Sequence, residues 1–159
     1  MKRPIVISLL TVVLLGALPR AAAADLTAFW GFNPTPARRS ATGFSLGVGL
    51  MVVAFEFEFS RTSEDEADGA PSLTTGMFNG LIQTPTSGVQ LYVTAGGGAY
   101  RERFREFQET SVATNVGGGI KIRLAGPVRL RVDYRMFALR GDPLFSKPKR
   151  VYAGLNIAF

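Results

Sequence analysis

The feature that most constrains this chain is an alternation of residue types with a period of two. In "VRLRVDYRMF" (128–137), apolar residues alternate with Arg, Arg, Asp and Arg. Successive side chains of a β-strand point to opposite faces, so this pattern predicts a strand with one apolar and one charged face. Similar alternating or glycine-rich apolar segments occur throughout the chain. They predict eight strands, at 25–33, 42–51, 52–61, 72–83, 89–101, 112–124, 127–139 and 149–159.

The connections between these strands alternate in length. Four are long and polar, at 34–41, 62–72, 101–111 and 140–149. Three are short, at 50–52, 84–88 and 125–127. Each predicted strand is close to the roughly 9–11 residues that a tilted transmembrane strand needs. The sequence therefore predicts an all-β fold, an eight-stranded up-and-down antiparallel transmembrane β-barrel with both termini at the end that carries the short turns.

The N-terminal residues have the three regions of a secretory signal peptide. Lys2 and Arg3 precede an uncharged run, and Ala22-Ala23-Ala24 has the small-x-small form of a cleavage site. We therefore expect a cleavable signal peptide at 1–24 and one outer-membrane barrel domain at 25–159. Removing the signal leaves 15 basic and 12 acidic residues. This modest charge on an exported chain argues against nucleic acid as a partner.

The predicted strands have one apolar, often aromatic face and one small or charged face. In 53–60, Val and three Phe oppose Ala, two Glu and Ser. Alternation alone does not say which face is outside. A water-soluble barrel would place the apolar face inside, but the polar face here is rich in glycine, which suits a narrow and crowded lumen. We therefore predict that the apolar face contacts lipid and that the charges point into the lumen.

The inward charges would form a network. Its predicted members are Glu56, Glu58, Lys121, Arg123, Arg129, Arg131, Asp133 and Arg135. Strands 52–61 and 127–139 lie four apart in a ring of eight, so Glu56 is expected opposite Arg131. The set has two more bases than acids, and the excess would be solvated near the ends. A paired plug is favoured over a gated ion path, because an unpaired buried charge is costly.

Three segments resemble a known family: "QTPTSGVQLYVTAGGGAYRERF" (83–104), "NVGGGIKIRLAGPVRLRVDYRMFALRGDP" (115–143) and "VYAGLNIAF" (151–159). They are similar to the small eight-stranded outer-membrane β-barrel proteins, the OmpA/OmpX-like transmembrane domain. The resemblance implies an outer membrane of Gram-negative type, periplasmic termini, and contact with membrane lipid and lipopolysaccharide. It also implies a terminal signal for the barrel-assembly machinery, formed by Ala153, Leu155, Ile157 and Phe159, although Ala153 is small where an aromatic residue is common.

The composition argues against catalysis. The chain has no histidine and no cysteine, which removes the usual bases and nucleophiles. No cofactor or metal is expected, since the acidic cluster Glu64, Asp65, Glu66 and Asp68 lacks the spacing of a dedicated calcium loop. The tripeptide 140–142 (Arg-Gly-Asp) matches an adhesion motif but is also ordinary turn composition. The favoured function is a non-enzymatic structural or surface-interaction role carried by the loops. The alternatives are a small pore for ions or solutes and a secreted soluble carrier.

Overall fold

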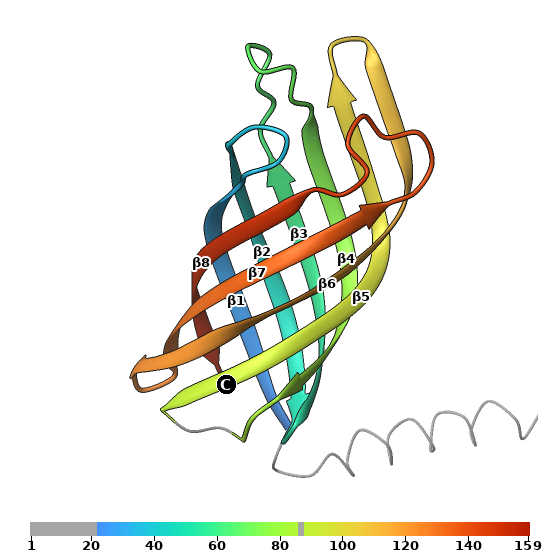
Figure 1. Cartoon of the computed structure of the whole chain (residues 1–159). Coiled ribbons are helices and arrows are strands. Elements are labelled where there is room, and N and C mark those ends of the chain that lie inside the picture. Colours follow the sequence, from blue (N-terminus) through green and yellow to red (C-terminus); the bar gives the residue numbers. More distant parts are fainter. Residues whose placement is uncertain (1–21, 86–87) are drawn as a thin grey trace, which may run out of the picture.

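The computed structural model describes residues 22–85 and 88–159, which form one closed β-barrel (Figure 1). Each strand pairs antiparallel with its neighbours in sequence, and β1 pairs with β8 to close the ring. The predicted eight-stranded up-and-down barrel is therefore confirmed. The strands are β1(Ala22–Asn33), β2(Arg39–Leu50), β3(Val53–Thr62), β4(Ser72–Gln83), β5(Val89–Phe104), β6(Phe107–Ala125), β7(Val128–Leu139) and β8(Lys149–Ala158).

One predicted loop is wrong. The segment 101–111 was expected to be a long connection, but β5 and β6 continue through it to 16 and 19 residues, and only Arg105 and Glu106 form the turn. The alternation continues here, with Glu102 buried between exposed Arg101 and Arg103. Arg105 has a φ of 54°, the left-handed conformation that two-residue hairpin turns require.

Both described ends of the chain lie at the end of the barrel that carries the short turns, here called the turn end; the opposite end is the loop end (Figure 1). The Ala24 and Phe159 backbones exchange two hydrogen bonds of 2.9 Å. Strand β1 begins at Ala22, three residues before the predicted start of the mature domain. Residues 1–21 of the predicted signal peptide lie outside the described residues.

The outer wall of the barrel is apolar. Large hydrophobic side chains are exposed around it, with Trp30 and Phe55 at 65% and Phe78 at 71% exposure. The inward positions are buried and mostly polar or charged. This arrangement is the reverse of the one expected for a water-soluble carrier. In the described parts of the chain, no helix is long and apolar enough to cross a membrane.

Candidate functional site

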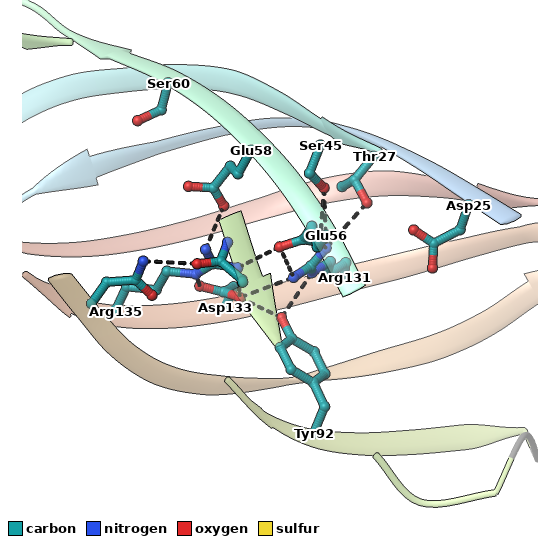
Figure 2. Close-up of polar contacts among 12 residues, drawn as sticks. Asp25, Thr27, Ser45, Glu56, Glu58, Ser60, Tyr92, Arg131, Asp133 and Arg135 are labelled. Carbon is teal, nitrogen blue, oxygen red and sulfur yellow. Dashed lines mark hydrogen bonds and ion pairs between the residues drawn. The ribbon is translucent and has the colours of Figure 1, made fainter. Parts of the chain in front are cut away.

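A cluster of ion pairs occupies the centre of the lumen (Figure 2). Arg131 on β7 reaches across the barrel and pairs with the carboxylate of Glu56 on β3. The second oxygen of Glu56 accepts a 2.8 Å bond from Arg135. Asp133, between the two arginines on β7, lies 3.3 Å from Arg131 Nη2 and 3.0 Å from Arg135 Nε. Each of these four side chains is at most 2% exposed, so their charges are compensated within the cluster rather than by bulk water.

Tyr92 completes this cluster from β5, midway between β3 and β7 in the ring, and was not predicted. Its hydroxyl donates to Asp133 and accepts a 2.8 Å bond from Arg131 Nε. Gly119 provides the space, because a Cβ at this position would lie 2.5 Å from the Tyr92 hydroxyl oxygen. The signal was present in the sequence, since the alternation over 89–94 places Tyr92 on the same strand face as the polar Gln90 and Thr94.

A second group of contacts extends the cluster toward the loop end. Glu58 pairs with Arg135 Nη1 at 3.0 Å and with Arg150 of β8, which was also not predicted. Arg150 donates to Ser60 as well. Its guanidinium lies 5.1–5.3 Å from the ring centres of three aromatic residues: Phe29, Phe137 and Tyr152.

At the turn end, Lys121 forms a 2.6 Å ion pair with Asp25 of β1. A cavity of about 210 Å³ opens beside this pair. Arg129 lines the cavity and lies 3.4 Å from the Gln90 side-chain oxygen, at the mouth rather than in the central cluster. Arg123 is exposed beside the irregularity in β6–β7 pairing, so its charge faces solvent and does not enter the network.

The lumen charges balance. The ion-paired acids are Asp25, Glu56, Glu58 and Asp133, and the ion-paired bases are Lys121, Arg131, Arg135 and Arg150. The expected excess of two bases is therefore not found in this set. It came from counting Arg123 and Arg129 as members; Asp25 and Arg150, which were not predicted, add one acid and one base and leave the balance unchanged.

The lumen between the ion pairs and the loop end holds a cluster of buried hydrophobic side chains next to buried polar ones such as Arg39 and Glu102. The buried cluster consists of Leu73, Met77, Tyr100, Ala113, Phe137 and Leu139. Two contacts hold the β7–β8 loop over it: the Tyr100 hydroxyl donates to the Arg140 carbonyl, and Leu144 N–H donates to Glu102 at 2.7 Å. Charged and hydrophobic side chains together occupy the lumen between the turn-end cavity and the loop end.

The remaining predicted features lie on the surface. Leu155, Ile157 and Phe159 point outward and are 44–75% exposed, and Ala153 is exposed on the same face. In the acidic β3–β4 loop, Asp65 accepts hydrogen bonds from the backbone of Ala67 and Asp68. Within residues 22–85 and 88–159, no group of three or more acidic side chains is placed to hold a metal ion.

The Arg-Gly-Asp tripeptide lies at the start of the β7–β8 loop. Gly141 has a φ of 84°, and Asp142 N–H donates to Glu109 of β6 at 3.3 Å. The tripeptide is thus exposed and is hydrogen-bonded to the β5–β6 hairpin. The positive φ of Gly141 explains why glycine occupies this turn position.

Comparison with known proteins relates this geometry to solved barrels. No protein-family model and no curated protein sequence matches the chain. Neisserial surface protein A has a TM-score of 0.65 at 17% identity, over 87% of this chain and 96% of that one. Ail, the attachment invasion locus protein of Yersinia pestis, has a TM-score of 0.52 at 14% identity, over 87% and 99%. Ail has also been solved with the heparin analogue sucrose octasulfate.

A third similar structure is an enzyme. The outer membrane enzyme PagL has a TM-score of 0.54 at 10% identity, over 84% of this chain and 98% of that one. The same architecture therefore serves enzymes and proteins named for surface attachment, and any function must be argued from this chain's own residues. At these identities the likeness concerns architecture: the chain has the fold of the small eight-stranded outer-membrane β-barrel proteins.

Proposed function

We propose that this protein is an outer-membrane barrel with a structural or surface-interaction role, in which the lumen is a plug and the loops meet the exterior. The observation that carries the proposal is an apolar exposed wall around a charge-balanced, filled interior. A closed barrel satisfies its backbone hydrogen bonds within the sheet, so it can lie in lipid. The names of Neisserial surface protein A and Ail support a surface role.

The packing of the lumen supports a plug over a pore. Eight strands leave an interior just wide enough for side chains to fill. Moving an ion through this interior would require separating Arg131 from Glu56 and displacing the apolar layer around Met77. Breaking a buried pair without replacing its partner costs several kcal/mol. The same enclosure argues against catalysis in the lumen, because the central carboxylates are out of reach of a substrate.

Membrane location and conductance can be tested together. The mature protein should fractionate with the outer membrane, and its unboiled form should migrate differently from its boiled form in detergent gels. In planar bilayers it should give no steady conductance. Recovery from the soluble periplasm would contradict the membrane location. Regular single-channel steps from the wild-type protein would favour the small pore instead.

We further propose that the C-terminal strand carries the assembly signal. Phe159 directly follows the last residue of β8, is 75% exposed, and exchanges two backbone hydrogen bonds with Ala24 of β1. Deleting it should lower the outer-membrane yield in cells far more than it lowers refolding into detergent. If Phe159 acted only through the stability of the barrel, its deletion would lower refolding into detergent as much as it lowers the outer-membrane yield in cells.

A further inference from the structure

The outer wall changes from apolar to basic at the loop end of two strands. On β3 the outward residues Phe55, Phe57 and Phe59 are followed by Arg61. On β5 an apolar outward row is followed by Arg101 and then Arg103. All three arginines are exposed.

The register brings these three arginines together. Arg61 pairs with Thr74 of β4, and Thr74 pairs in turn with Arg101 of β5. Because neighbouring strands are 4.7–4.9 Å apart, the Arg61 and Arg101 backbones lie about 10 Å apart. Arg103 follows two residues later on the same face. The three side chains, Arg61, Arg101 and Arg103, form what we call the wall arginines.

The wall arginines retain binding capacity. Arg101 Nε donates to Thr110 at 3.4 Å and Arg103 Nε donates to Gln108 at 2.9 Å, and both partners are uncharged. These contacts orient the guanidinium groups through one nitrogen each. The two Nη groups of each arginine can form bidentate hydrogen bonds with phosphate oxygens.

We propose that the wall arginines bind the phosphate groups of a glycolipid of the lipid A type in the outer leaflet. The inference rests on the membrane location proposed above. With the phosphates at the wall arginines, the acyl chains would run down the aromatic wall from Phe59 toward Phe55. The ligand would approach from the side, within the leaflet.

Charge on the adjacent loop favours a lipid over a soluble polyanion. The β3–β4 loop above Arg61 carries four acids, Glu64, Asp65, Glu66 and Asp68, and Glu64 accepts a long 3.5 Å bond from Arg105 N–H at the hairpin tip. A polyanion descending from outside would meet this acidic loop first. A lipid phosphate moving within the leaflet would not.

The experiment compares lipid retention by purified, folded mature protein in detergent. The probes are bisphosphorylated lipid A and the same lipid with its phosphates removed, and bound lipid is counted by native mass spectrometry. The variants are Arg61→Gln, Arg101→Gln, Arg103→Gln and their combination. Arg123→Gln is the matched control, because Arg123 is an exposed arginine at the opposite end of the barrel.

We expect wild-type protein and the Arg123→Gln control to retain phosphorylated lipid A in preference to the phosphate-free lipid. Each wall substitution should weaken that retention roughly fivefold. Equal retention of the two lipids, or an equal loss in the Arg123→Gln control, would overturn the proposal. Binding of the same variants to immobilised heparin is measured alongside, and a loss of heparin binding with lipid retention unchanged would also overturn the proposal and assign the wall arginines to a soluble polysaccharide. Fractionation of the wild-type protein tests the membrane location separately.

Discussion

At the scale of single residues, Glu56 holds the centre of the lumen together. One carboxylate oxygen of Glu56 accepts hydrogen bonds from Arg131 and, at 3.0 Å, from Ser45, and the other oxygen accepts from Arg135. Both arginines are fully buried. Glu56→Gln keeps the size but removes the charge, which leaves two arginines with too few anions. We expect it to lower the free energy of unfolding by about 3–5 kcal/mol.

Urea unfolding of the barrel in lipid vesicles would measure this loss. Glu66→Gln is the control, because Glu66 is an exposed acid in the β3–β4 loop. If Glu56→Gln were as stable as that control, the central cluster would not be a stabilising plug.

Space at Gly119 is a second residue-scale requirement. In Gly119→Ala, the new methyl would lie 2.2 Å from the Val132 carbonyl oxygen and 2.5 Å from the Tyr92 hydroxyl. Such overpacking typically costs about 1–3 kcal/mol. Gly76→Ala is the matched control on the outer wall, where nothing lies within 4 Å. Heating the unboiled gel sample should convert Gly119→Ala to the unfolded band at a lower temperature than either wild type or the control. Equal midpoints would show that Tyr92 moves aside at little cost.

Sequence reasoning could identify some lumen residues and not others, for physical reasons. Alternation puts Glu56 and Arg131 on polar faces, and the strand count puts those strands opposite each other. Alternation does not give the direction of a long side chain, so Arg150 near the loop end could not be matched to Glu58 in advance. Asp25 is the first residue of the predicted strand 25–33, directly after the predicted cleavage site, where too little alternation precedes it to assign its face.

At the scale of elements, register decides where each strand leaves the barrel. The dense charge of 101–111 predicts a loop, yet the alternation of inward and outward side chains continues into the β5–β6 hairpin. Pairing between these two strands alone continues to Phe104 and Phe107, whereas β6 pairs with β7 only from Ala113 onward. Dense charge here therefore does not mark the end of a strand, since β5 stays paired with β4 as far as Arg103.

The outer face of each strand should tolerate charge according to depth. Val132 lies in β7 with its side chain outward, and Val132→Arg should cost roughly 2–4 kcal/mol if it lies near the midplane. Thr42→Arg is the control, because Thr42 is an exposed outward residue near the loop end, beside Arg61 in the register. There the cost should be about 0–1 kcal/mol. Urea unfolding in vesicles would measure both, and a harmless Val132→Arg would mean that this face does not contact lipid.

At the scale of the whole molecule, the fold follows from one conflict and its resolution. The chain has too many large apolar side chains on one face for a narrow core, and too many charges on the other to leave unpaired. An apolar face that points outward requires lipid around the barrel. Charged side chains that point inward require equal numbers of acidic and basic groups in the lumen. The four acids and four bases that form ion pairs in the lumen meet the requirement for equal numbers. Because the charged face therefore points inward, the apolar face points outward, as a barrel in lipid requires.

The orientation of the whole barrel can be predicted from the same asymmetry. Short turns and both described chain ends lie together, so we expect that end to face the periplasm and the long loops to face outward. An epitope inserted after Asp68, at the exposed tip of the β3–β4 loop, should be reached by antibody on intact cells. The same epitope at Gly126, whose φ of 53° marks the tight β6–β7 turn, should be reached only after the outer membrane is permeabilised. Labelling at Gly126 on intact cells, with none after Asp68, would reverse the orientation and would place the wall arginines in the inner leaflet, away from lipid A.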